Sequence, residues 1–323
     1  MEETTSRIDL TGFSEKINEL KKCISEVVVG QDKAVDLILT AILANGHVLI
    51  EGVPGVAKTL MAKIISRLID ADFSRVQFTP DLMPSDILGT TVFNMKTSSF
   101  DFHRGPLFGD VILVDEINRA PAKTQSALFE VMEERQATID GKSYQMGELY
   151  TILATQNPVE QEGTYKLPEA QIDRFLMKVT LGYPSLEEEV AILERHHEQA
   201  EFVKLRNVKP VLKKEELLSL RELTRKVYVE PTLIRYVALI IQQTRTSKSI
   251  YLGASPRASV CLLQAAKAFA LLQGRDFVTP EDIKFVAVPV LQHRLLLTAE
   301  AEMEGYSTAK VSQRLIEKVE VPK

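Results

Sequence analysis

The sequence contains only two cysteines and no tryptophan among its 323 residues. Cys23 and Cys261 lie far apart, and neither has a second cysteine nearby. This arrangement excludes a disulfide framework and gives no support to a thiolate zinc site. We therefore expect a protein of a reducing compartment, with the cytoplasm as its location.

The chain also lacks the hydrophobic segments that target a protein to a membrane or anchor it there. Residues 1–13, MEETTSRIDLTGF, are acidic and polar, where a signal peptide is basic and then apolar. No uninterrupted apolar run approaches the roughly 18 residues of a membrane span. The sequence therefore predicts no membrane span, and its 45% of hydrophobic residues is ordinary for packed globular cores.

A strong charge of one sign is missing as well, since 39 basic residues against 44 acidic ones give a formal charge of −5. Residues 1–184 carry 18 basic and 26 acidic side chains, whereas residues 185–323 carry 21 and 18. Neither part has the positive charge with which a protein binds polyanions through bulk electrostatics. At roughly 150 residues per domain, the length predicts about two domains.

Between about residues 31 and 180, short apolar runs alternate with segments whose apolar residues recur at helical spacing. Val35, Ile38 and Ile42 form one such helical face. The alternation is typical of a parallel sheet with crossover helices, so we expect a doubly wound α/β fold. The five predicted strands are the runs at 47–50, 73–78, 111–114, 150–154 and 175–180.

Two segments interrupt this alternation, and a third region abandons it. Residues 90–104 and 136–147 each predict a hairpin. After Pro184 the strand signals end, and helices are predicted at about 186–199, 213–227, 231–245, 256–272 and 280–295. We therefore divide the chain into an N-terminal helical segment (1–27), an α/β core (28–184) and a C-terminal α-helical domain (185–323).

Residues 52–59, GVPGVAKT, follow a predicted strand and open a predicted helix, which is the context of a Walker A loop. Glycines let the backbone wrap a phosphate with its N–H groups turned inward, and the helix N-terminus adds its positive dipole. In such a loop Lys58 reaches the β- and γ-phosphates of ATP, and Thr59 ligates Mg²⁺. Ala57 replaces a usual glycine, but alanine tolerates helical backbone angles, so we expect the loop to survive. The residues predicted to hold ATP are Gly52, Val53, Pro54, Gly55, Val56, Ala57, Lys58, Thr59 and Leu60.

A second motif, VILVDE at 111–116, is an apolar run that ends in two carboxylates. This is the Walker B pattern, in which Asp115 holds the Mg²⁺ shell through water and Glu116 polarises the attacking water as a general base. Acidic residues also follow strands simply because strand ends are solvated. The phosphate-binding loop about fifty residues upstream favours the catalytic interpretation.

Three further polar residues stand where an oligomeric ATPase needs them. Asn157 follows the predicted strand 150–154, from which it could orient the attacking water at the carboxyl edge of the sheet. Arg174 precedes the last predicted strand, and Arg257 lies on the first turn of a helix that begins at Pro256. Taken singly, Asn157 is typical of a turn, and the two arginines are typical of surface side chains.

In this order along the chain, the motifs resemble those of the AAA+ ATPases, and within them the MoxR family. The resemblance covers nearly the whole chain from Val28 onward. It implies an AAA+ P-loop NTPase domain with a parallel five-stranded sheet and a C-terminal α-helical lid domain, and it places Val28, Val29 and Gly30 against the adenine. The motifs that carry it are GVPGVAKT, DLMPSDILG (81–89), GPLF (105–108), VDEINRA (114–120), ATQNP (154–158), LPEAQIDRF (167–175) and GASPRA (253–258).

The resemblance also implies roles for the isolated polar residues. Asn157 would be the sensor-1 residue, Arg174 the arginine finger that reaches a neighbour's nucleotide, and Arg257 the sensor-2 arginine of the lid. A finger supplied in trans requires subunits packed head to tail, so we expect a closed homo-oligomeric ring, with six subunits as the family norm. Arg119 and Arg135 remain rival trans-acting arginines on sequence alone.

The function that the resemblance implies is a chaperone-like ATPase that remodels a protein client, as in enzyme maturation or metal-cofactor insertion. Proteins with von Willebrand factor A domains are the partners that the family suggests. The alternative is a nucleic-acid motor, such as a helicase loader or branch-migration ATPase, which predicts a basic pore. The two hairpins, which are implied to line the pore, carry few basic residues: Lys96, Arg104, Lys142 and also His103, against Asp101 and Asp140. We therefore expect no nucleic-acid partner.

Overall fold

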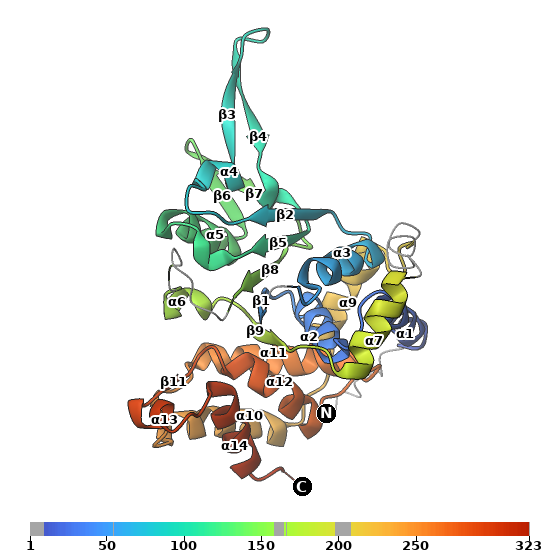
Figure 1. Cartoon of the computed structure of the whole chain (residues 1–323), viewed down its shortest axis with the longest axis vertical. Coiled ribbons are helices and arrows are strands. Elements are labelled where there is room, and N and C mark those ends of the chain that lie inside the picture. The colour runs from blue at the N-terminus through green and yellow to red at the C-terminus, as the bar shows by residue number, and fades with distance from the viewer. Residues whose placement is uncertain (1–9, 54, 158–164, 166, 198–207, 323) are drawn as a thin grey trace, which may run out of the picture.

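A five-stranded parallel sheet forms the centre of the chain (Figure 1). The computed structural model describes residues 10–53, 55–157, 165, 167–197 and 208–322. The strand order is β2-β5-β8-β1-β9, and every neighbouring pair is parallel, which confirms the predicted fold class. The strands are β1 (Val48–Gly52), β2 (Phe73–Gln77), β5 (Val111–Asp115), β8 (Thr151–Gln156) and β9 (Met177–Leu181).

The central strands are buried because helices cover both faces of the sheet. Alternate residues of β5 point to opposite faces: Val111 and Leu113 join one hydrophobic cluster, whereas Ile112 and Val114 join the other. The first cluster contains α2 (Asp32–Leu43) and α3 (Lys58–Leu68), and the second contains α5 (Ala122–Glu134). Shorter elements of this part are α4 (Pro84–Leu88), η1 (Pro106–Phe108), η2 (Ile117–Arg119) and α6 (Glu169–Ile172).

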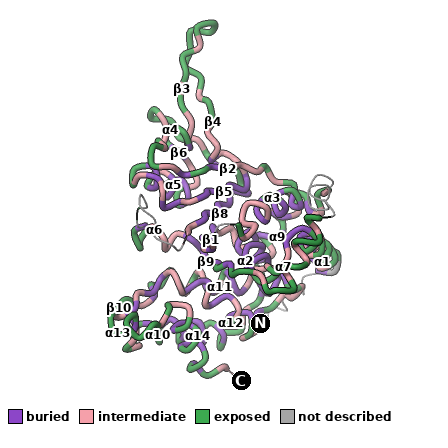
Figure 2. Tube along the Cα trace, viewed as in Figure 1, coloured by how far each residue is buried: buried purple, intermediate pink, exposed green. Residues whose placement is uncertain are grey.

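Both predicted hairpins are present. The first consists of β3 (Gly89–Asn94) and β4 (Ser99–Arg104), and the second of β6 (Gln136–Ile139) and β7 (Lys142–Gln145). The β3–β4 hairpin projects far from the body of the molecule, and its outer part is exposed (Figures 1 and 2). Phe93 and Phe100 pack edge to face across it, with ring centroids 5.1 Å apart, while both stay exposed.

Among the described residues, three helices flank the core on the side of α2 and α3 (Figure 1). They are α1 (Thr11–Ser25), α7 (Leu186–His197) and α9 (Lys214–Lys226). The Arg195 side chain of α7 donates hydrogen bonds to the carbonyls of Ser25 and Glu26, each at 3.0 Å, and α9 contacts α2 and α11. Residues 1–9 of the predicted N-terminal segment and residues 198–199 of the predicted helix 186–199 lie outside the described residues.

The C-terminal helices form a layer below the sheet in Figure 1. They are α10 (Pro231–Thr246), α11 (Pro256–Leu272), α12 (Pro280–Leu291), α13 (Ala299–Met303) and α14 (Thr308–Lys318). Helix α11 packs on α2, so the hydrophobic cluster on that face of the sheet continues into this layer. Within the described ranges, no helix combines the length and apolar character needed to cross a membrane.

This layer differs from the sequence-based expectation in three ways. Helix α12 ends at Leu291 instead of residue 295. Two short strands, β10 (Ile250–Leu252) and β11 (Leu296–Leu297), pair with each other where only helices were expected. Such short strands give no periodic signal. Helices α13 and α14 were not predicted, although Val311 and Leu315 carry the helical spacing of α14.

Candidate functional site

The loop between β1 and α3 is a tight turn that leads from a strand into a helix. Gly52 ends β1 and Lys58 begins α3. Gly55 and Ala57 between them have left-handed backbone angles, with φ values of 89° and 57°. The Lys58 ammonium donates a hydrogen bond to the Gly52 carbonyl at 2.8 Å and so folds back over the loop. Pro54 lies outside the described residues, while the half-buried members are Val53, Val56, Ala57, Lys58, Thr59 and Leu60.

Ala57 departs from the sequence-based expectation. We expected alanine to tolerate this position because it adopts ordinary helical angles, but its φ of 57° and ψ of 22° are left-handed. Left-handed angles cost a residue with a Cβ atom about 1–2 kcal/mol, a cost that glycine avoids. The described part of the loop therefore carries backbone strain at Ala57.

Strand β5 lies between β2 and β8, and these two neighbours bring polar partners beside Asp115. In the parallel register, Asp115 at the end of β5 pairs with Gln77 at the end of β2. One carboxylate oxygen of Asp115 accepts a hydrogen bond from the Thr155 hydroxyl at 3.2 Å, and the other accepts from the Arg75 Nε at 2.6 Å. The Asp115 side chain is only 10% exposed, and both of its carboxylate oxygens have hydrogen-bond partners within the protein.

Glu116 leaves the strand with a left-handed backbone angle, φ 56°. Its backbone N–H donates to the Thr155 hydroxyl at 3.0 Å. Its carboxylate accepts a hydrogen bond from the Gln77 amide at 2.9 Å, and the Arg119 guanidinium lies 3.3 Å from the same oxygen. The predicted general base is therefore held in place by two side chains of its own subunit.

Arg75, Gln77 and Thr155 were missed as site residues. Arg75 and Gln77 are two positions apart on β2, so their side chains point to the same face. That spacing of polar residues within an apolar run was an available signal. Thr155 carried none, because a threonine at the end of a buried strand is an ordinary strand residue.

Lys58 links the loop to the two carboxylates. Burial lowers the pKa of the Lys58 ammonium, while Asp115 and then Glu116 act in the opposite direction and favour its charged form. Asn157 follows the end of β8, the strand that lies between β5 and β1. Lys58, Asp115, Glu116 and Asn157 therefore gather at the carboxyl ends of three adjacent strands, the edge at which open α/β sheets bind ligands.

The residues at this edge fit a nucleotide with a divalent cation. Left-handed residues next to a helix N-terminus form a concave arrangement of backbone N–H groups that suits phosphate. Thr59, Asp115 and Thr155 offer oxygen atoms, the ligand type that Mg²⁺ prefers. Because Arg75 is bound to Asp115, a cation at this carboxylate would compete with a guanidinium.

The segment expected against the adenine lies between α1 and α2. Val28 is buried, whereas Gly30 is exposed and left-handed, with φ 70°. The Glu188 carboxylate of α7 lies directly against Gly30. A pocket of about 310 Å³ opens beside Gly30, between α2, β9 and α12. The segment 28–30 and helix α7 therefore contact each other at this end of the core.

Arg174 and Arg257 meet at Glu133, near the end of α5. The Arg257 Nη2 donates to the two carboxylate oxygens of Glu133 at 3.0 and 2.7 Å. The Arg174 Nε lies 3.9 Å from the same carboxylate, and its Nη1 donates to the Phe129 carbonyl. Their side chains remain 29% and 46% exposed. The core arginine Arg174 and the lid arginine Arg257 thus contact the same side chain of α5, Glu133. The Lys58 ammonium instead faces the two carboxylates of Asp115 and Glu116.

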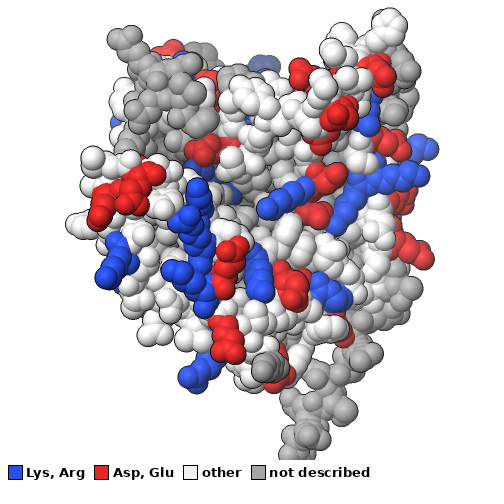
Figure 3. Space-filling view, turned by 60° about the horizontal axis from the view of Figure 1, so that its bottom comes forward, with Lys and Arg blue, Asp and Glu red and all other residues white. Residues whose placement is uncertain are grey.

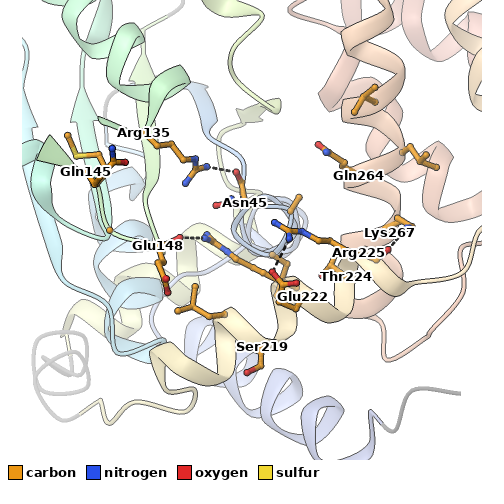
Figure 4. Close-up of a pocket in the computed structure, with 18 residues that line it drawn as sticks. Asn45, Arg135, Gln145, Glu148, Ser219, Glu222, Thr224, Arg225, Gln264 and Lys267 are labelled. Carbon is orange, nitrogen blue, oxygen red and sulfur yellow. Dashed lines mark hydrogen bonds and ion pairs between the residues drawn. The ribbon is translucent and has the colours of Figure 1, made fainter. Parts of the chain in front are cut away.

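The rival arginines are engaged within the subunit. Arg135 donates hydrogen bonds to the carbonyls of Asn45 and Tyr150 at 2.7 and 3.1 Å, at the wall of a cavity of about 1070 Å³ (Figure 4). Asn45 precedes β1 and Glu148 precedes β8, so this cavity lies at the amino ends of the strands, away from the loop with Lys58. Arg119 lies beside Glu116 of its own chain.

Known proteins resemble this chain over nearly its whole length. Residues 47–177 match a family model described as the ATPase family associated with various cellular activities (AAA), and residues 242–316 match an AAA lid domain. Chaperone MoxR1 of Mycobacterium tuberculosis is 43% identical over 323 residues, covering 96% of this chain and 84% of the relative. This chain belongs to the MoxR family of AAA+ ATPases.

Two further proteins are similar to this chain over nearly its whole length. The uncharacterized protein YeaC of Bacillus subtilis is 45% identical over 299 residues, covering 93% of this chain and 92% of the relative. A protein from Cytophaga hutchinsonii, whose crystal structure is known, is 42% identical in sequence. The two structures align with a TM-score of 0.88 over 96% of each chain. The MoxR resemblance inferred from the motifs is therefore confirmed, together with the AAA+ domain and its lid.

Proposed function

We propose that this MoxR-family protein hydrolyses ATP within a closed ring of identical subunits and uses the cycle to remodel a protein client. One observation carries the ATPase proposal: Lys58, Asp115, Glu116 and Asn157 meet at the carboxyl edge of the sheet, beside a left-handed loop. In this proposal the loop backbone, Lys58 and Thr59 hold the phosphates of ATP, and residues 28–30 face the adenine.

The catalytic roles follow from the side chains at this edge. Bound Mg²⁺ supplies positive charge at the phosphates, and Thr59 and Asp115 would hold it. Glu116 accepts a proton from the attacking water, which Asn157 orients. Gln77 and Arg119 keep the Glu116 carboxylate in place until it acts. Arg75 releases Asp115 when the cation binds.

We further propose that Arg174 and Arg257 act on the nucleotide of a neighbouring subunit. Their shared position at Glu133 and their partial exposure support this role, whereas Arg135 is turned into its own subunit. An arginine finger in trans stabilises transition-state charge by a factor of roughly 10³ to 10⁵. Because each contact in such a ring is heterologous, the ring must close, and we propose six subunits.

The proposed client is a protein, and the β3–β4 hairpin is the proposed contact. Val92, Phe93, Met95 and Phe100 leave apolar side chains exposed on this projection. Enzyme maturation or metal-cofactor insertion, with a von Willebrand factor A domain protein as partner, is the process that we propose. A nucleic-acid motor is less well supported, since basic and acidic side chains are intermixed on the face in Figure 3 and no basic track appears there.

Replacing Glu116 with glutamine tests the ATPase and the ring together. We expect Glu116→Gln to keep ATP binding, to lose turnover by roughly 10²-fold or more, and to form the larger assembly at saturating ATP. Glu148→Gln is the matched control, because it makes the same change at an exposed carboxylate beyond the opposite edge of the sheet. Normal turnover in Glu116→Gln, or a monomer at micromolar protein with saturating ATP, would contradict the proposal.

A further inference from the structure

Three consecutive residues after α12 bind the backbone of the turn that carries Arg174 and of strand β9, which follows it. Gln292 donates a hydrogen bond from its amide to the Lys178 carbonyl at 2.6 Å. His293 donates from Nε2 to the Phe175 carbonyl at 3.1 Å. Arg294 binds Asp173 and Phe175, the residues on either side of Arg174. The lid is therefore joined to the Arg174 turn through the end of α12.

Arg294 makes the most extensive of these connections. Its Nε donates to the Asp173 carboxylate at 2.6 Å, and its Nη2 donates to the Asp173 and Phe175 carbonyls at 3.0 and 2.6 Å. Its Nη1 donates to the Leu176 carbonyl at 3.1 Å and to the Val290 carbonyl. The side chain is 2% exposed. Lysine cannot reproduce this arrangement, because only the planar guanidinium presents five donors in fixed directions.

The same guanidinium also reaches the helix that carries Arg257. The Arg294 Nη2 lies 3.6 Å from the Cys261 sulfur, and Cys261 is one turn after Arg257 on α11. Arg257 in turn shares Glu133 with Arg174. The buried Arg294 thus lies between two lid helices and the turn that holds Arg174.

We propose that Arg294 is a positioning residue that fixes the Arg174 turn to the lid, so that Arg174 and Arg257 approach a neighbour's nucleotide as one body. The inference rests on the proposed function of these two arginines in trans. Loss of Arg294 leaves the subunit's own phosphate-binding loop intact but delivers a misplaced arginine pair to the next subunit. The expected effect is a fall in kcat with little change in KM for ATP.

Mixing subunits separates this role from a general structural one. Arg294→Lys keeps the positive charge but loses the planar guanidinium and its fixed hydrogen-bond donors. We expect kcat to fall roughly 10- to 100-fold, as for a small misplacement of a catalytic group. Lys58→Ala subunits cannot use their own nucleotide but still carry an intact Arg174. Added in excess, they should restore turnover several-fold at the sites of Arg294→Lys subunits. Arg314→Lys, on the exposed surface of α14, is the matched control and should leave kcat unchanged.

Arg174→Ala mixed with Lys58→Ala is the reference for the proposed function. If this reference is restored while Arg294→Lys is not, the inference about Arg294 is wrong and the trans-acting arginine stands. If neither mixture is restored, the proposed function itself fails. Normal kcat in Arg294→Lys alone also overturns the inference. If Arg294→Lys does not fold, Asp173→Asn replaces it in the experiment, because this change removes the carboxylate partner of Arg294. Mixing Asp173→Asn with Lys58→Ala subunits should then restore turnover in the same way.

Discussion

The Nε atom of Arg75 lies 2.6 Å from a carboxylate oxygen of Asp115, the proposed Mg²⁺ ligand. The Arg75 side chain is 48% exposed, so it reaches the nearly buried carboxylate from the solvent side. Thr155 binds the other oxygen. A positive charge thus neutralises Asp115, and in the proposed mechanism cation binding would include the displacement of this guanidinium.

Removal of this guanidinium should make Mg²⁺ binding easier. We expect Arg75→Ala to lower the Mg²⁺ concentration for half-maximal ATPase activity by up to about fivefold, because a half-exposed ion pair contributes about 1 kcal/mol or less. A magnesium titration at fixed ATP measures the shift. Arg75→Lys keeps the charge and should shift less. A higher Mg²⁺ requirement in Arg75→Ala would instead make Arg75 part of the nucleotide site.

Relief of the backbone strain at Ala57 gives a second prediction. Ala57→Gly removes about 1–2 kcal/mol of left-handed strain, but the greater freedom of glycine in the unfolded chain costs about 0.4–1 kcal/mol. We therefore expect a net stabilisation of up to about 1.6 kcal/mol. ATP affinity should be retained. Ala57→Val forces a β-branched residue into left-handed angles and should therefore lose ATP affinity. Denaturant unfolding and nucleotide titration measure both effects, and a destabilised glycine variant would contradict the assigned angles.

His47 predicts a dependence of stability on pH. Burial, followed by the nearby Arg135, lowers the pKa of His47 to about 3. Its neutral ring accepts a hydrogen bond from the Ile152 N–H at 3.0 Å and contacts the Met132 carbonyl at 3.3 Å. The unfolded histidine takes up a proton near its ordinary pKa of about 6.5. The contribution of the neutral ring is therefore fully present above that pH and is lost as the pH falls toward 3.

We expect this group to reduce the free energy of unfolding by up to about 1.4 kcal/mol per pH unit below about pH 6. Equilibrium unfolding between pH 7 and 5 measures the slope of the unfolding free energy against pH. His47→Gln should lower this slope by the amount that corresponds to about one proton taken up on unfolding. His196→Gln, at an exposed position on α7, should leave the slope unchanged. Equal slopes in all three proteins would refute the buried neutral ring.

Arg135 and Arg174 should give opposite results when each is replaced by alanine. Arg135→Ala leaves two carbonyls without their donor, so we expect a loss of about 2–3 kcal/mol in unfolding free energy and normal turnover per folded molecule. Arg174→Ala should change stability by about 1 kcal/mol or less and reduce turnover roughly 10³-fold. Thermal melts and ATPase assays on both variants measure the contrast. A loss of turnover in Arg135→Ala at full folding would revive it as the trans-acting residue.

The features that were predicted correctly are those that neighbouring residues determine. The runs at 111–114 and 150–154 are buried strands because every residue in them is apolar or small, and the segment 52–59 combines glycines, lysine and threonine at a strand–helix junction. The hairpins followed from short polar turns between strand-forming residues. These signals are local, so the α/β fold and the strand–loop–helix turn at 52–59 could be inferred before any tertiary contact was known.

The features that were missed depend on distant partners. Arg294 binds Asp173 across 121 positions of sequence, and Arg75 binds Asp115 across 40. Nothing near Arg294 distinguishes it from a surface side chain, and Arg75 carries only the weak signal of its alternate spacing with Gln77. The partner of each arginine is brought close only by the lid packing or by the sheet order. The left-handed angle at Ala57 was also hidden, since alanine is not the residue that signals such an angle.

The length of the β3–β4 hairpin has a mechanical consequence. Its two strands have six residues each, so at about 3.4 Å per residue they form an arm of roughly 20 Å. Its base is tight, because a Cβ atom on Gly105 would collide with the Ile87 carbonyl. An arm clamped in this way turns together with the core beneath it. A rotation of about 10° at the base sweeps the tip through about 3–4 Å, so small angular changes near the sheet become a stroke at Phe93 and Phe100.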